Sequence, residues 1–103
     1  MITYDSQLEA LGDPTRREIL DRLRRRPMAV GELAAAFPIS RPAISQHLKI
    51  LKDARLVVDR ADGNRRVYAI DVRGFALVRA YLDQFAAGVA ESEPADDTSW
   101  RNW

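Results

Sequence analysis

Two short apolar patterns with helical spacing lie on either side of Pro38-Ile39, and this arrangement limits the fold more than any other feature of the sequence. The first pattern occupies residues 30–37 and ends at the proline. Ser40 is a suitable N-cap for the second. The apolar positions of that second pattern are Ile44, Leu48 and Leu51. Because two short helices joined by a three- or four-residue turn form a helix-turn-helix, we predict that motif here, with its second helix over residues 40–53.

The sequence period changes from helical to alternating directly after this motif. Between residues 56 and 70, β-prone runs flank Asp62-Gly63-Asn64. An Asp-Gly pair between such runs is a strong hairpin signal, because tight hairpin turns need positive φ angles. A hairpin directly after a helix-turn-helix is a wing. The sequence therefore predicts a mostly α-helical fold with a small β-hairpin, a winged helix-turn-helix with the element order α-α-α-α-β-β-α.

Further helices are predicted on both sides of this unit. Apolar spacing predicts a first helix over residues 3–11, and Asp13-Pro14 provides an N-cap and a first-turn proline for a second helix that closes at Pro27. A last helix is predicted over residues 73–90, with an apolar stripe that needs a covering surface. We expect residues 1–90 to form one winged-helix domain. The acidic segment 91–103 is predicted to be a mobile tail, in which Trp100 and Trp103 have no assigned role.

The net charge of +1 hides a segregation of charge along the chain. Residues 1–15 carry a net −3, residues 16–73 a net +7 from fourteen Lys and Arg against seven acids, and residues 74–103 a net −3. A basic middle segment is typical of proteins that bind nucleic acid. No apolar run approaches the ~18 residues of a membrane span, and no secretion signal is visible, so we expect a cytoplasmic protein without membrane association. The absence of cysteine excludes disulfides and thiolate ligands.

The outward face of the predicted helix 40–53 is small, polar and basic, with no acid before Asp53. A helix that enters the DNA major groove must be narrow there and must offer donors and acceptors to base edges. Gln46 suits adenine and Arg41 suits guanine. An ordinary amphipathic surface helix is the alternative, although such a helix usually mixes Glu into that face. The predicted DNA-binding residues of this helix are Ser40, Arg41, Pro42, Ser45, Gln46, His47 and Lys49.

Basic residues beside the hairpin turn complete the predicted interface. Arg60, Arg65 and Arg66, with Asn64 at the tip, lie where a β-ribbon reaches phosphates or a minor groove. Arg16 and Arg17 are predicted either to contact phosphate or to be solvated. His47, the only histidine, is expected to be half-buried, with a structural or phosphate-contacting role favoured over base readout.

The sequence resembles the ArsR/SmtB family of bacterial repressors over about residues 3–85. The family's opening signature matches Leu11-Gly12-Asp13-Pro14-Thr15-Arg16-Arg17 followed by Ile19-Leu20, and the run from Ser40 to Leu51 matches its recognition helix. Leu56-Val57, Gly63, Arg65 and Tyr68 match the wing. The resemblance implies a winged helix, repression by occupying a promoter, and a dimer built from the first and last helices. Within those helices the expected dimer residues are Tyr4, Leu8, Val78, Tyr81, Leu82, Phe85 and Val89.

The sequence departs from the metal-sensing members of that family. Glu32-Leu33-Ala34-Ala35-Ala36 stands where those sensors carry cysteines, and no histidine follows His47. Carboxylates alone, such as Asp71, Asp83 and Glu91, do not make a transition-metal site. We therefore expect no metal and no other cofactor, and the sequence does not identify a small-molecule inducer.

The resulting prediction is a homodimeric repressor of an inverted-repeat, double-stranded operator. A winged helix that serves as a protein-interaction module is the main alternative. It predicts that the protein has no DNA affinity that falls steeply with salt concentration. An enzyme is disfavoured, because the sequence contains no Gly-rich phosphate loop, paired acid cluster or nucleophile–base arrangement.

Overall fold

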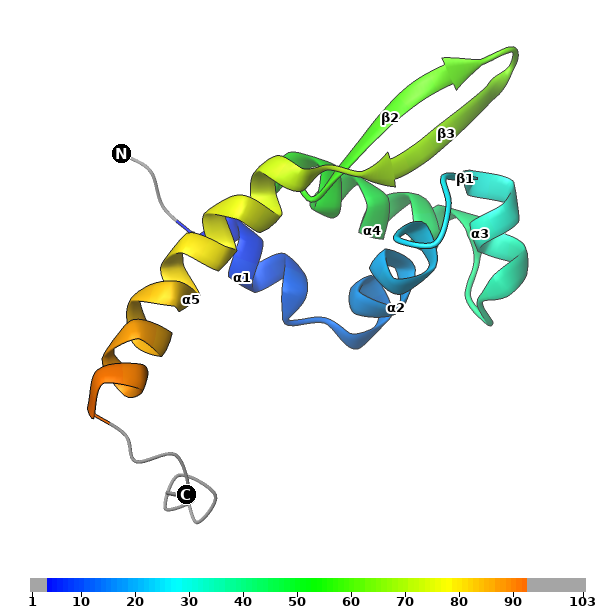
Figure 1. Cartoon of the computed structure of the whole chain (residues 1–103). Coiled ribbons are helices and arrows are strands. Elements are labelled where there is room, and N and C mark those ends of the chain that lie inside the picture. Colours follow the sequence, from blue (N-terminus) through cyan, green and yellow to red (C-terminus); the bar gives the residue numbers. More distant parts are fainter. Residues whose placement is uncertain (1–3, 93–103) are drawn as a thin grey trace.

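The computed structural model of the protein describes residues 4–92, and over residues 88–92 it describes the helical backbone alone. Within this range the elements follow one another as α1 (Asp5–Leu11), α2 (Pro14–Leu23), β1 (Met28–Ala29), α3 (Val30–Ala36), α4 (Arg41–Asp53), β2 (Val57–Asp62), β3 (Arg65–Ile70) and α5 (Val72–Ser92). Figure 1 shows the hairpin β2–β3 and the far end of α5 projecting from opposite sides of the body. The predicted helix-turn-helix (α3 and α4) and wing (β2 and β3) are confirmed.

The sheet contains one strand that the predicted element order lacks. Its strand order is β1-β3-β2, and β1 pairs antiparallel with β3 through Met28 opposite Tyr68. A two-residue strand carries no alternating pattern, so only its tertiary pairing with β3 reveals it. The wing turn lies within the predicted segment Asp62-Gly63-Asn64, because Asp62 pairs with Arg65 and leaves Gly63-Asn64 as the turn. Gly63 has a φ of +63°, the left-handed conformation that a tight hairpin turn requires.

The helix ends follow local capping signals closely. Asp13 caps α2 by accepting the Arg16 backbone N–H at 3.1 Å, and Pro14 occupies the first turn, as predicted. The helix ends at Leu23, however, four residues before Pro27. At α3, the Glu32 carboxylate accepts the Ala29 backbone N–H at 3.0 Å, so the helix start is fixed by a side chain from its own first turn.

The C-terminal end of α4 is closed by an unusual residue. The Leu56 N–H donates to the Leu51 carbonyl and the Arg55 N–H to the Lys52 carbonyl, both at 2.9 Å, which is a Schellman motif. The position that this motif usually gives to glycine holds Arg55, with a φ of 60°. The arginine backbone is therefore held in a strained conformation at the end of the helix.

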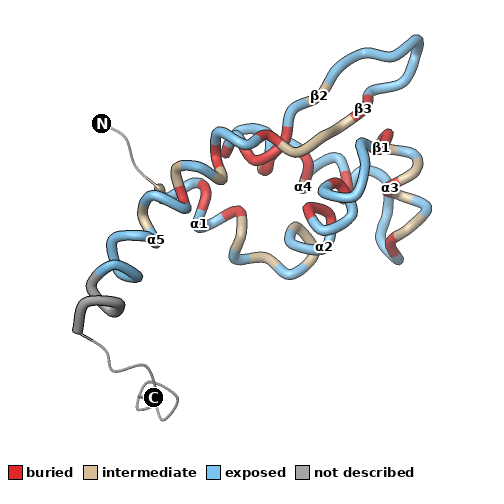
Figure 2. Tube along the Cα trace, viewed as in Figure 1, coloured by how far each residue is buried: buried red, intermediate tan, exposed pale blue. Residues whose placement is uncertain are grey.

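A single core lies where α2, α3 and α4 meet the base of the wing, as the buried segments of Figure 2 indicate. The apolar faces predicted for residues 14–26 and 40–53 are buried, which confirms those two helical patterns. The largest fully buried side chains are Ile19, Leu33, Ile44, Leu48, Leu51, Leu56 and Val57. The wing tip and residues 82–87 of α5 are exposed instead.

The last helix begins where it contacts the end of α4. Asp71 caps α5 by accepting the Arg73 backbone N–H at 2.9 Å, and the Gly74 N–H donates to the Arg55 carbonyl at 2.9 Å. The helix then continues to Ser92, two residues beyond the predicted end. The predicted mobile tail, with Trp100 and Trp103, lies outside the described residues from residue 93 on. None of the helices within residues 4–92 is long and apolar enough to cross a membrane.

Candidate nucleic-acid interface

The outward face of α4 is exposed along the length that the sequence assigned to DNA. Residues on this face share high solvent exposure and a lack of negative charge, and they are Ser40, Arg41, Pro42, Ser45, Gln46 and Lys49. Ser40 also fixes where the helix starts, because its Oγ accepts the Ala43 backbone N–H at 3.2 Å. Pro42 has no N–H and the Ile44 N–H donates to the Ser40 carbonyl at 3.1 Å, so in the first turn only the Arg41 N–H points out of a helix end that carries a partial positive charge, which attracts phosphate.

Charge on this face is neutralised only towards the C-terminal end of the helix. Lys49 Nζ lies 2.9 Å from Asp53 Oδ2, one helical turn later. Arg41, by contrast, makes no ion pair with any of the described residues. The N-terminal half of the α4 face is therefore the more positive half, and it is also the half that a recognition helix inserts most deeply.

His47 is half-buried, in agreement with the sequence prediction, and it lies against α2. Arg16 Nη1 is 3.4 Å from His47 Nδ1. A guanidinium can only donate, so the histidine Nδ1 is the acceptor in this contact. The ring thus joins the recognition helix to the start of α2.

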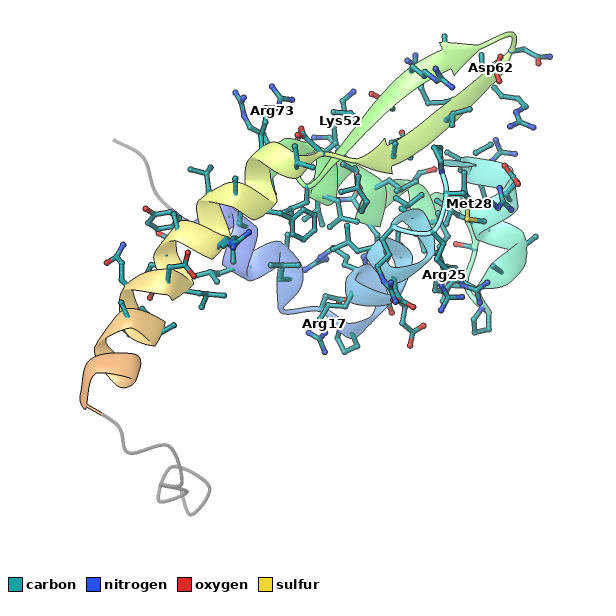
Figure 3. The ribbon with its side chains drawn as sticks, viewed as in Figure 1. Arg17, Arg25, Met28, Lys52, Asp62 and Arg73 are labelled. Carbon is teal, nitrogen blue, oxygen red and sulfur yellow. The ribbon has the colours of Figure 1, made fainter. Side chains whose placement is uncertain are left out.

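Arg16 does not have the solvated role that was one of the two interpretations of the sequence, since its side chain is only 13% exposed, and its contact with phosphate stays a prediction. Its Nε donates to the Ala10 carbonyl at 2.8 Å and its Nη2 to the Glu9 carbonyl at 3.2 Å. The guanidinium therefore caps the C-terminal end of α1. Arg17 does the same from an exposed position, through a 2.8 Å bond from Nη1 to the Leu11 carbonyl (Figure 3 labels Arg17).

An acid at the start of α3 restrains one of the wing arginines. Glu32 Oε1 lies 3.6 Å from Arg65 Nη2, and Glu32 Oε2 accepts from Arg26 Nη1 at 3.0 Å. The backbone N–H of Ala29, and after it the Arg26 guanidinium, lower the pKa of the Glu32 carboxyl, so this group is ionised at neutral pH. Glu32 therefore ties the wing to the helix-turn-helix.

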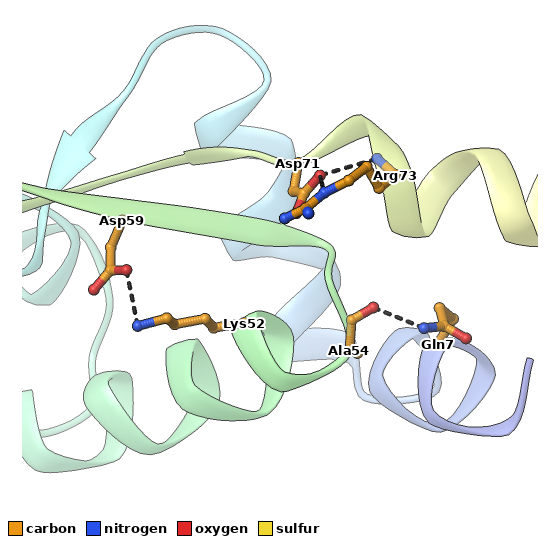
Figure 4. Close-up of polar contacts among 6 residues, drawn as sticks. All are labelled: Gln7, Lys52, Ala54, Asp59, Asp71 and Arg73. Atoms are coloured by element: carbon orange, nitrogen blue, oxygen red, sulfur yellow. Dashed lines mark hydrogen bonds and ion pairs between the residues drawn. The ribbon is translucent and has the colours of Figure 1, made fainter.

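A second acid ties the wing to α4 itself. Asp59, whose side chain is only 10% exposed, lies 2.9 Å from Lys52 Nζ and 3.5 Å from Arg66 Nε. Figure 4 shows the Lys52–Asp59 pair bridging from α4 to β2. Among the wing arginines only Arg60 makes no ion pair within the described residues. Arg60 and Asn64 are exposed and face solvent at the outer part of the wing.

Sequence reasoning identified the exposed cations but not the acids that hold them. Glu32 stands at the third position of α3, the place from which Glu caps a helix start, so its bond to Ala29 had a local signal. Asp59 had none, because its partners Lys52 and Arg66 come together only when the hairpin folds back beside α4. Within the described residues, no three His, Cys, Asp or Glu side chains are grouped so as to hold a metal ion.

The expected dimer residues fall into two groups. Leu8, Leu82 and Phe85 are exposed by 39, 52 and 59%, respectively. Tyr81 joins them to α1, since its ring centroid lies 5.0 Å from that of Tyr4 and 5.2 Å from that of Phe85. The remaining two expected residues behave differently. Val78 is 7% exposed, so it lies on the part of the apolar stripe of α5 that is buried within the protomer. The side chain of Val89 lies outside the described range.

Comparison with known proteins agrees with this geometry. The model of the bacterial regulatory protein arsR family matches residues 13–58, which include α2, α3 and α4. The HTH-type transcriptional regulator Rv2034 of Mycobacterium tuberculosis is 57% identical over 88 residues, covering 82% of each chain. The chain belongs to the arsR family.

Other relatives support the same assignment. The transcriptional repressor SdpR of Bacillus subtilis is 44% identical over 63 residues, covering 61% of this chain and 70% of that protein. An ArsR-like transcriptional regulator from Rhodococcus sp. RHA1 superposes with a TM-score of 0.75 at 30% identity, covering 87% of this chain and 92% of that one. As a member of the arsR family, the protein is a DNA-binding transcriptional regulator with a winged-helix fold, and it is not an enzyme.

Proposed function

We propose that this arsR-family protein is a homodimeric repressor that occupies an inverted-repeat operator in promoter DNA. Each protomer would place the N-terminal half of α4 in a major groove. The observation that carries this proposal is the exposed, acid-free face of α4 from Ser40 to Lys49, which begins at a capped helix end. A surface of this size and polarity fits a groove that is about 12 Å wide.

Within this face, the direct reading of bases is assigned to Gln46 and Arg41. Gln46 is exposed, and its amide can both donate to and accept from the edge of an adenine. Arg41 lies in the first turn and has no ion-pair partner in the described part of the chain, so its guanidinium is available to a guanine. Ser45 and Pro42 are small enough to let the backbone approach the bases.

The wing is assigned to the DNA backbone. Arg60 and Asn64 supply exposed donors, while Arg65 and Arg66 are held in place by Glu32 and Asp59. Ion pairing of a surface arginine reduces its conformational freedom, so less entropy is lost when it then contacts a phosphate. Phosphate contacts of this kind fix the position of a protein on DNA without reading sequence.

Dimerisation is assigned to the exposed apolar surface of α1 and α5. Leu8, Leu82 and Phe85 lie on that surface, and Tyr4 and Tyr81 stack between the two helices. Large exposed apolar residues that cluster in this way are typical of protein–protein interfaces. A two-fold axis there would present two α4 helices to half-sites about 10 bp apart, or a multiple of that spacing.

The test is selection of bound DNA from a random pool by the purified full-length protein, followed by binding measurements on the selected site. We expect an inverted repeat and an affinity that falls steeply with salt. Gln46→Ala should cost about 1–3 kcal/mol and relax preference at one base pair of each half-site. Gln84→Ala, the same change at an exposed position of α5, is the matched control and should leave both unchanged.

Two results would contradict the proposal. If no sequence is enriched and DNA affinity does not depend on salt, the fold serves a protein partner instead. If Gln46→Ala weakens binding but leaves the base preference intact, α4 does not read sequence through this residue.

A further inference from the structure

Gln7 is a buried polar residue whose bond joins α1 to the end of the recognition helix. The side chain is 5% exposed, and its Nε2 donates to the Ala54 carbonyl at 2.8 Å (Figure 4). Ala54 is the C-cap of α4 and is itself 1% exposed. Forty-seven positions separate the two residues, so this contact is entirely tertiary.

The second polar atom of the Gln7 amide makes this bond more informative. Gln7 Oε1 is buried and accepts no hydrogen bond within the described residues. Burying an amide oxygen without a donor costs free energy, and an apolar side chain of similar size would avoid that cost. The hydrogen bond from Nε2 to the Ala54 carbonyl is therefore the one favourable interaction that glutamine makes at this position and an apolar side chain could not make.

The carbonyl oxygens after α4 are the natural place for this kind of contact. The last carbonyl groups of a helix have no partner within the helix. At this end the Ala54 oxygen accepts from Gln7 on α1, and the oxygen of the next residue, Arg55, accepts from the Gly74 N–H on α5 at 2.9 Å. These two helices also contact each other through the rings of Tyr4 and Tyr81, which are tilted by 32°.

The same two helices carry the proposed dimer face. Gln7 points into the protomer, whereas the next residue, Leu8, is 39% exposed on the outer side of α1. A shift of α1 against a partner would therefore move the Gln7 amide, and with it the end of α4. Lys52 and Asp59 connect that same end to the wing.

We propose that Gln7 is a positioning residue that transmits the geometry of the dimer face to the recognition helix. The inference rests on the proposed dimeric, operator-binding function and adds a residue to it that touches neither DNA nor the partner. Through the Ala54 carbonyl, Gln7 fixes the angle of α4 relative to α1, and thus the separation of the two α4 helices in the dimer.

The experiment compares Gln7→Met in two backgrounds. Met has a similar length but cannot donate to Ala54. On the selected operator, the dimeric Gln7→Met protein should bind about tenfold more weakly than wild type, because the two α4 helices are no longer held at the separation of the half-sites. Its affinity for scrambled DNA should change by less than about twofold, because the positive charges are unchanged. Ser6→Ala, at the exposed neighbouring position of α1, is the control.

The second background separates transmission from simple support of the fold. Phe85→Glu places a charge on the dimer face and should give a monomer, which binds a single half-site weakly. If Gln7 transmits dimer geometry, adding Gln7→Met to this monomer leaves half-site affinity within about twofold, because a monomer has no second α4 whose separation could change. An equal loss of affinity in monomer and dimer would overturn the proposal, and so would no loss in either.

The same question can be tested independently in proteins that keep Gln7, by comparing the wild-type dimer with the Phe85→Glu monomer. Hydrogen exchange at the N–H groups of residues 54–56 should be slower in the wild-type dimer than in the Phe85→Glu monomer. Equal rates would overturn the inference while leaving the operator intact. Failure of wild type to select any operator would instead refute the proposed function itself.

Discussion

Replacing Gly74 by alanine should destabilise the protein, because this glycine lets α5 start directly against the end of α4. A Cβ built at Gly74 lies 2.3 Å from the Arg55 carbonyl oxygen and 2.9 Å from that of Ala54. Both are backbone atoms, so neither can turn away, and ordinary van der Waals contact needs 3.4 Å or more. The backbone would have to separate by roughly 1 Å, and the Gly74–Arg55 hydrogen bond would weaken.

The expected change in unfolding free energy follows from two destabilising effects and one stabilising effect. Overpacking a tight backbone contact costs about 1–3 kcal/mol. Weakening one hydrogen bond adds up to about 1 kcal/mol. Alanine regains about 1 kcal/mol of helix propensity. We therefore expect Gly74→Ala to lower the free energy of unfolding by up to about 3 kcal/mol and Tm by up to about 20 °C.

Urea unfolding at one fixed protein concentration measures this change, because the stability of a dimer depends on concentration. Gly31→Ala is the matched control. Gly31 lies in α3, is exposed, and has no atom within 4 Å of its built Cβ, so the same substitution should stabilise by about 0.5–1 kcal/mol. The reasoning is refuted if the two substitutions change stability in the same direction.

Two further predictions concern the same junction. Arg55→Gly should raise the unfolding free energy by about 0.5–1 kcal/mol, because glycine adopts the positive φ of the α4 cap without strain, and a loss of stability in urea unfolding would contradict this. The Arg73 guanidinium, which hydrogen-bonds to Asp71, lowers the pKa of that carboxyl below its ordinary value of about 3.9. The stability that this ion pair contributes is therefore complete above about pH 4–5 and disappears as the pH falls through the lowered native pKa. Compared with Asp71→Asn in unfolding experiments from about pH 6 to pH 2, wild type should keep its advantage down to about pH 4–5 and lose it below that, and an advantage that does not change with pH would exclude this role.

Local signals in the sequence predicted much of the interface. Ser40 as an N-cap and an apolar face at helical spacing together predicted α4 and thereby which side chains face outward. Each of these signals acts within a few residues of the chain. For the same reason Gly63 marked the wing turn, which consists of Gly63 and Asn64.

The contacts that hold the interface in place had no such signal. Arg16 resembled a surface cation in the sequence, yet it is mostly buried against the carbonyls of α1 and the ring of His47. Asp59 was given no role from the sequence, yet it pairs with both α4 and β3. Charged side chains like these take their role from elements that are distant in the sequence, and periodicity carries no information about them.

The helix-turn-helix and the polar face of α4 were determined by the sequence alone, because capping and apolar periodicity are short-range properties of the chain. The tertiary structure decided the pairing of β1 with β3 and the contacts at the end of α4. There Gln7, Arg55 and Gly74 form contacts between backbone and side-chain groups up to 47 positions apart. Such contacts depend on the angle at which helices pack, and that angle is set only when the core of α2, α3 and α4 closes around its buried side chains.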